Sequence, residues 1–329
     1  MFALSLAAAS VALADPSASG EGTGPGELGF LETPPFPDLP ISEALRIRLG
    51  TLIAPDAPVG SGEVTLVRPE LNLRATWPAR DDLVLRLALR LAESDYTFHG
   101  NVWGSSLGAA PGPSVDPDAL IGDLDLHSVR LALEGAYRLS NSTNWLAEGE
   151  QWAVIGSVYG GSRWEDRDFR HGLETGGALG VGYEIPKRLR VALGISLRTP
   201  IDNAGLSLGP LISLRWRPTD RFTLRTRDLG LQAEYALTPA FGVLIAGFRS
   251  SDTHRLDQRD PLRDLTFRDR QVRFASGFDW TLANWLHLEL EGGAIVDRHL
   301  RIKDEDLGTL LSRHGDPSGY CEVRLEFRL

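Results

Sequence analysis

Three side chains suited to metal binding and acid–base chemistry recur at every second position near the C-terminal end: His287, Glu289 and Glu291. Residues two apart project from the same face of a β-strand, about 7 Å from each other. An imidazole and two carboxylates on one face could bind a divalent cation or activate a water molecule. Charged residues that face the interior of a barrel have the same spacing, and we favour this plainer interpretation. The sequence therefore predicts no metal site, no cofactor and no catalytic residue.

The end of the chain shows which element would carry such a face. Residues 320–329 alternate strictly, with Cys321, Val323, Leu325, Phe327 and Leu329 on one face and Glu322, Arg324, Glu326 and Arg328 on the other. This period of two is that of a β-strand. A terminal strand with one apolar and one ionic face is typical of the closing strand of a bacterial outer-membrane β-barrel, whose edges must all be paired because lipid offers no hydrogen bonds.

Alternating segments follow one another from about residue 41 to the end. The clearest cover residues 83–91, 189–199, 206–216, 272–280 and 286–296, and weaker ones fill the intervals. With the final strand they number about 14, and 12 is the alternative; both are even, as in single-chain bacterial barrels. The sequence therefore predicts an all-β fold, a closed antiparallel up-and-down transmembrane barrel.

The connections between these segments alternate in length. Tight turns are predicted at residues 78–82, 140–144, 186–188, 217–220, 238–240 and 281–284, and mostly longer connections at 55–62, 99–123, 160–171, 200–205, 251–267 and 297–319. Outer-membrane barrels have short periplasmic turns and longer extracellular loops. Within the last connection, residues 304–314 also carry Leu307, Leu310 and Leu311 at helical spacing, which predicts a short loop helix.

Aromatic residues gather near the predicted periplasmic ends of the segments. We assign an aromatic girdle to Trp77, Trp145, Trp216, Tyr235, Trp280, Trp285 and Phe327. Amphipathic rings prefer the headgroup level of a membrane, which explains such a girdle. The opposite rim has fewer candidates: Tyr96, Phe98, Tyr159, Trp164 and Phe248.

Charged side chains alternate with the apolar ones and would face the interior of the barrel. The candidate pore-lining residues are Arg86, Arg90, Arg130, Glu134, Arg190, Arg198, Arg215, Arg273, Glu289, Glu291, Arg324 and Glu326. One interpretation is an arginine-lined, water-filled pore that favours anions, since rings of one charge set selectivity. The other is that opposed arginine and glutamate side chains pair with each other and plug a narrow barrel.

The N-terminal part of the chain differs in composition from the rest. Residues 1–14 resemble a secretory signal that ends in an A-x-A-like site, although no basic residue precedes the apolar run. Residues 15–40 are rich in Gly, Pro and Ser and predict a disordered linker, which leaves residues 41–329 for the barrel. The net charge of −10 argues against nucleic acid as a partner, and Cys321, the single cysteine, excludes an intrachain disulfide.

Residues 211–247 resemble an uncharacterised family of bacterial outer-membrane β-barrel proteins, a domain of unknown function. The resemblance lies in a tryptophan before a proline-containing turn, here Trp216-Arg-Pro218, and in the run Tyr235-Ala-Leu-Thr-Pro239. These motifs mark turns and girdles, so the resemblance implies fold and location and transfers no catalytic residue.

The sequence as a whole predicts an exported outer-membrane barrel that acts as a porin-like passive channel for small polar or anionic solutes. Two alternatives remain open: a structural barrel whose lumen is plugged by Arg/Glu pairs, and an outer-membrane hydrolase with a site at the barrel rim. The expected partners are outer-membrane lipid and the barrel-assembly machinery, which would engage the C-terminal strand. No interface signature points to an oligomeric state.

Overall fold

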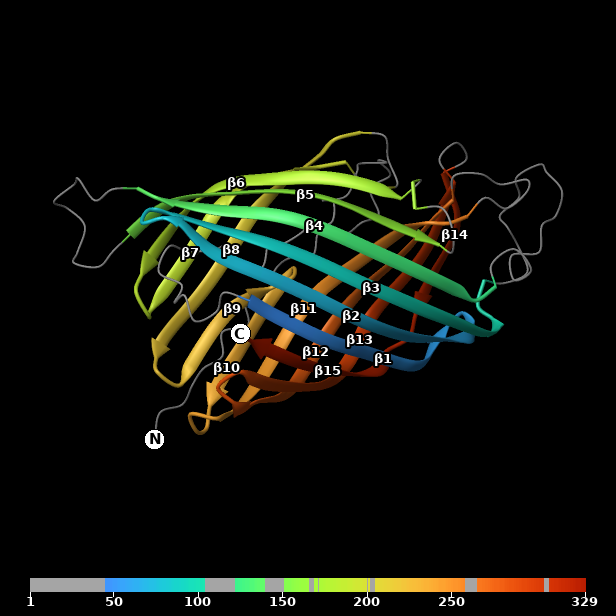
Figure 1. Ribbon diagram of the computed structural model, residues 1–329. Coiled ribbons are helices and arrows are strands. Elements are labelled where there is room, and N and C mark those ends of the chain that lie inside the picture. Colours follow the sequence, from blue (N-terminus) through green and yellow to red (C-terminus); the bar gives the residue numbers. More distant parts are fainter. Residues whose placement is uncertain are drawn as a thin grey trace, which may run out of the picture.

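The computed structural model describes residues 45–103, 122–139, 151–165, 169–170, 172–199, 201, 205–257, 265–304 and 308–329. The predicted signal, the predicted linker and Trp145 lie outside these residues. The described chain forms an elongated β-barrel (Figure 1). Its strands are β1 (Leu45–Val59), β2 (Ser61–Arg80), β3 (Leu83–Asn101), β4 (Leu124–Arg138), β5 (Gln151–Glu165), β6 (Leu173–Ile185), β7 (Leu189–Arg198), β8 (Ser207–Thr219), β9 (Phe222–Arg227), β10 (Gly230–Ala236), β11 (Phe241–Arg255), β12 (Thr266–Ala283), β13 (Leu286–Asp304), β14 (Gly308–Gly315) and β15 (Ser318–Arg328). Within the described residues, no helix is long and apolar enough to cross a membrane.

The barrel is closed between the first and the last strand. β1 pairs antiparallel with β15 from Arg46 opposite Arg328 to Ile53 opposite Cys321. The backbone amides of Leu45 and Leu329 also donate to each other's carbonyl oxygens, at 3.1 and 2.8 Å. Closure leaves neither of these strands with an unpaired edge, which is the condition for a sheet to stand in lipid.

The last two strand segments share one position in the barrel wall. β13 pairs with β15 through Leu286–Ile295 and with β14 through Arg298–Asp304. Between β14 and β15, Asp316 and Pro317 leave the strand conformation, as expected where proline removes a backbone donor. The described segments therefore make a ring of 14 strands, and the predicted fold class and strand number are confirmed.

The two ends of the barrel differ. At the end that we call the turn end, the connections are short: residues 81–82, 186–188, 220–221, 237–240 and 284–285. Both closing strands meet there, and the C-terminus marks this end in Figure 1. These connections fall at or beside the predicted tight turns. We call the opposite end the loop end.

Two predicted connections at the loop end are wrong, because strand pairing continues through them. Residues 55–62 form the loop-end parts of β1 and β2, and the chain reverses direction between these strands at Gly60. The register shifts between Ala54 and Ala57, where Asp56 takes a positive φ of 42°. Such a bulge absorbs an extra residue and tolerates proline in a strand. Residues 297–304 likewise extend β13.

The helix predicted over residues 304–314 is also wrong. Residues 308–315 form β14, which pairs with the upper part of β13. Leu311 of β14 packs into the barrel interior among other buried apolar side chains, and Leu310 packs against the same cluster. Tertiary pairing with β13 overrides a local spacing that fits a helix equally well.

The outer face of the barrel is a broad apolar belt. Exposed side chains there include Leu49, Leu87, Leu131, Leu179, Leu193, Leu208, Ile245, Phe274, Leu290 and Val323. The exposed fraction reaches 64% at Ile245 and 66% at Leu208. On β13 the belt ends at Val296, beyond which the outward side chains are Asp297, His299, Arg301 and Lys303.

Aromatic side chains lie on the outer face close to the turn end. Of the predicted girdle, Trp77, Trp216, Tyr235, Trp280 and Trp285 are exposed there, and Phe327 stacks on Trp285 with ring centroids 6.2 Å apart. Four of the candidates for the opposite rim are wrong, because their rings lie inside the barrel: the Tyr159 ring lies against Arg130, and Phe98 packs against the interior apolar cluster. Tyr96 and Phe248 are 2% and 4% exposed and belong to the interior.

Candidate functional site

The candidate pore-lining residues lie on the inward face of their strands. The structure places Arg86, Arg90, Arg130, Glu134, Arg190, Arg198, Arg215, Arg273, Glu289, Glu291, Arg324 and Glu326 on this face, alternating with the lipid-type side chains of the belt. Strand alternation fixes this orientation, because the apolar set of each strand occupies the outside. The interior then divides into a charged region toward the turn end and a second region toward the loop end.

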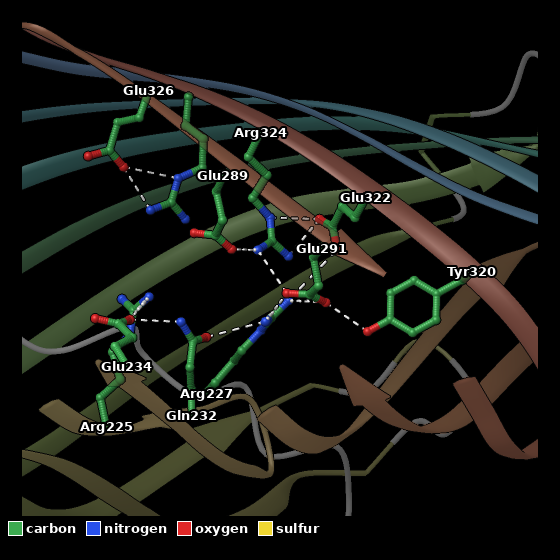
Figure 2. A network of polar contacts seen from close by, with 11 residues as sticks. Arg225, Arg227, Gln232, Glu234, Glu289, Glu291, Tyr320, Glu322, Arg324 and Glu326 are labelled. Carbon is green, nitrogen blue, oxygen red and sulfur yellow. Dashed lines mark hydrogen bonds and ion pairs between the residues drawn. The ribbon is translucent and has the colours of Figure 1, made fainter. Parts of the chain in front are cut away.

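A polar network crosses the charged region. Arg227 of β9 reaches the carboxylate of Glu291 on β13, and it also donates to Gln232 at 3.2 Å (Figure 2). Glu291 accepts from the Tyr320 hydroxyl at 2.7 Å. Because β9 and β13 are separated by three strands in the ring, this link spans the interior and does not run along the wall.

Arg324 of β15 extends the network on the other side of Glu291. It bonds to Glu289, lies 2.6 Å from Glu322 and 3.6 Å from Glu291 (Figure 2). Fork-shaped guanidinium groups suit several carboxylates at once, because their donors lie in one plane. Arg227 therefore links β9 to the acidic strands β13 and β15 across the interior, and Arg324 links β13 to β15.

Other charged residues form pairs along the wall. Arg86 lies 3.3 Å from Glu134, Arg190 lies 2.6 Å from Glu184, and Arg90 lies 2.7 Å from Glu70. Glu326 accepts from both Arg48 and Arg328. Most predicted lining residues thus have an ionic partner, as expected in the structural interpretation of the lumen.

Glycines on β6 make room for one such arrangement. The Arg130 guanidinium lies over the Tyr159 ring, 3.5 Å from its centroid. A Cβ atom added to Gly176 would come within 2.5 Å of that ring. The small residue lets the ring lie flat against the wall, where it positions Arg130 by a cation–π contact.

The interior toward the loop end is apolar and excludes solvent. We call it the loop-end layer; its core is Leu52, Leu66, Tyr96, Leu124, Leu126, Phe248, Phe267, Ile295, Leu300, Ile302 and Leu311, all nearly or fully buried. The ring also narrows there, since Arg255 of β11 pairs directly with Trp164 of β5. Side chains from strands across the ring meet, as when the Tyr96 and Phe267 rings pack edge to face at 4.9 Å.

A buried ion pair is enclosed in this layer. Arg298 donates to Asp269 at 2.7 Å, and both side chains are 1% exposed. Asp269 also accepts from the Tyr96 hydroxyl at 3.0 Å and from Gln271 at 2.6 Å. A buried carboxylate needs such partners, because desolvation makes an unpaired charge very unfavourable.

A second charged cluster lies where the loop-end layer meets the charged region. Asp252 of β11 binds Arg68 of β2 and lies 3.8 Å from Arg163 of β5, which is 3.3 Å from Glu174. The contacts join β2, β5, β6 and β11 across the interior. They brace the barrel where the ring narrows.

The side chains of His287, Glu289 and Glu291 do not assemble into a common site. His287 shares a hydrogen bond of 3.0 Å with Thr281, whereas Glu289 and Glu291 are both held by Arg324. Among the described residues, no group of three or more His, Cys, Asp or Glu side chains could hold a metal ion.

Two histidines face each other outside the belt, on the outer surface of the β13–β14 hairpin. The His299 and His314 rings stack with centroids 4.3 Å apart, and His299 bonds to Ser312 at 2.6 Å. Partial burial, and then the nearby charges of His314, Arg301 and Arg270, lower the pKa of His299 to about 4. This ring is therefore neutral at neutral pH.

Sequence reasoning missed Arg68, Arg227, Asp252, Asp269 and Arg298. Arg298 and Asp252 fall in predicted connections. The available signal was the continued alternation Arg298, Leu300, Ile302 beyond the apolar belt. Their partners are distant in sequence, so no local pattern reveals the pairs.

The sequence matches no family model, and no curated protein matches it. Several solved structures are similar in shape. An outer membrane channel from Pseudomonas putida F1 shares 12% identity with a TM-score of 0.47, over 88% of this chain and 96% of that one. The toluene transporter TodX from P. putida shares 11% identity with a TM-score of 0.39, over 88% of this chain and 92% of that one. The NanC porin shares 11% identity with a TM-score of 0.31, over 87% of this chain and 100% of that one. These values carry no argument about activity, and the fold rests on the strand pairing itself.

Proposed function

We propose that the protein is an integral outer-membrane barrel that acts as a porin-like passive channel for small polar or anionic solutes. One observation carries the proposal: leucine, isoleucine and phenylalanine cover the outside, while arginine and carboxylate side chains occupy the inside toward the turn end. A water-soluble barrel would have the opposite arrangement. An apolar exterior and a polar interior suit a barrel that lipid surrounds and water enters.

The membrane orientation follows from the two ends. Short turns, both closing strands and the exposed tryptophans lie at the turn end, which we assign to the periplasm. Lipid would contact the belt, and the assembly machinery would engage β15. Membership of the domain-of-unknown-function family that residues 211–247 resemble belongs to the same proposal, supported by the Trp216 and Tyr235 turn motifs.

The charged region gives the channel its solute preference. Arg90 and Arg215 are exposed on the inward face, so water reaches guanidinium groups there. The loop-end layer is the barrier, and passage requires its apolar side chains to separate. Hydrophobic constrictions of this kind gate channels by excluding water.

A purely structural barrel is the second candidate, and the dry loop-end layer favours it. The two functions differ in liposome swelling. A channel makes proteoliposomes swell in small amino acids or sugars, whereas a structural barrel leaves them as tight as empty liposomes. Recovery in the outer-membrane fraction, with a heat-dependent mobility on gels, tests the location independently of conduction.

A further inference from the structure

Three arginines stand side by side on the inward face near the turn end. Arg190 of β7 is directly opposite Arg215 of β8, and Arg215 is directly opposite Arg225 of β9. We call these residues the arginine row. Directly opposed side chains lie about 5 Å apart at their Cβ atoms, and like charges at this distance destabilise a sheet.

Carboxylates neutralise only the two ends of the row. Glu184 lies 2.6 Å from Arg190, and Glu234 lies 2.7 Å from Arg225. Among the described residues, none forms an ion pair or hydrogen bond with the Arg215 side chain. The charges that act most strongly on Arg215 are those of Arg190, Arg217 and Arg225, followed by Glu234.

The surroundings of Arg215 leave its charge available. The residue is exposed, unlike Arg86, which is buried beside Glu134. The next inward row toward the loop end is Gly182, Ala192 and Ser213, which brings no carboxylate to the arginines. A solvent-accessible guanidinium between two others thus faces the lumen with unused donors.

We propose that the arginine row is a binding subsite for small oxyanions, the carboxylate or phosphate group of a solute, with Arg215 as its central ligand. A guanidinium presents two parallel N–H donors to such a group, and the flanking arginines add charge. The bound anion would relieve the repulsion within the row. The subsite rests on the proposed channel function for its role as the first contact of a solute from the periplasmic side.

The test measures binding of inorganic phosphate, and separately of acetate, to the refolded full-length barrel by isothermal titration in low-chloride buffer. We compare the wild type with Arg215→Gln and with Arg221→Gln, which removes one charge from a turn at the same end. Losing a charge-assisted pair should weaken binding about tenfold or more in R215Q. R221Q should bind as the wild type does, and Arg215→Lys should fall between, because a lysine keeps the charge and loses the fork.

Equal binding by R215Q and the wild type would overturn the subsite, as would equal weakening in R221Q. Folding of each variant is checked by its heat-dependent gel mobility, and R215K covers the case in which R215Q fails to fold. Conduction is measured in parallel. A barrel that binds phosphate at Arg215 but conducts nothing supports the subsite and refutes the channel. A barrel that conducts without binding phosphate supports the channel and refutes the subsite.

Discussion

The turn-end and loop-end halves of the interior use arginine in different ways. In the loop-end layer, Arg298 and Asp269 are sealed among apolar side chains and paired with each other. Toward the turn end, Arg90 is 43% exposed beside Glu70, and Arg215 has unused donors. The same residue type therefore stabilises one half and remains available to a solute in the other. Burial and partner count, and not the number of arginines, decide which role each plays.

The largest effect is expected when the buried pair is broken. Asp269→Ala leaves the Arg298 guanidinium uncompensated in an apolar layer, which should lower the free energy of unfolding by about 4 kcal/mol. Urea titration of the barrel in detergent measures this change. The matched control is Glu70→Gln beside the half-exposed Arg90, which should cost less than about 1 kcal/mol. Similar losses for both variants would abolish the distinction between the two halves.

Opening the loop-end layer should change conduction. Leu126→Ala removes a fully buried side chain from the layer; it should destabilise the barrel by about 3 kcal/mol and raise the frequency of channel openings. Planar-bilayer recordings measure the openings. Leu131→Ala, on the same strand but facing outward, serves as control and should leave conduction unchanged. If both variants conduct like the wild type, the layer is not the barrier.

Removing a charge from the arginine row should change the free energy of unfolding in the opposite direction from breaking the buried pair. Removing its central charge with Arg215→Gln relieves like-charge repulsion and should raise the free energy of unfolding by about 0.5 kcal/mol. The same urea titration, run at low ionic strength, reports the gain, which salt should diminish. Destabilisation by R215Q would mean that Arg215 has a structural role after all.

The last prediction concerns the stability of the barrel in acid. The pKa of His299 in the folded barrel, about 4, lies below the ordinary value of 6.5. Between pH 4 and pH 6.5, the unfolded chain therefore binds a proton at His299 and the folded barrel does not. Stability from this group is present above pH 6.5 and is lost as pH falls toward 4. His299→Asn should flatten the pH dependence of urea unfolding in this window. An unchanged slope would assign the acid sensitivity to other groups.

The wall of the barrel could be predicted from the sequence, because strand alternation is a local property. The run from Tyr320 to Leu329 shows both faces of β15, and the Trp216 and Tyr235 turns mark the turn end. The helix at residues 304–314 was wrong because Leu307, Leu310 and Leu311 fit two periods, and only pairing with β13 selects the strand.

The interior could be predicted only as a face, not as a set of contacts. Arg227 meets Glu291, and Tyr96 meets Phe267, across a ring whose closure brings distant strands together. The alternation that placed Arg86 and Arg215 on one kind of face gives no sign that the first is paired and the second open, and Arg298, which is sealed, fell in a predicted connection. Sequence distance hides partners of this kind.

The reversal potential of the wild-type barrel in a planar bilayer under a salt gradient tests the central claim most directly. We predict intermittent openings whose reversal potential has the sign of anion permeation, since the accessible charges toward the turn end are guanidinium groups. Openings with a cation preference, or a correctly inserted barrel that stays silent, would contradict the proposed anion-favouring channel.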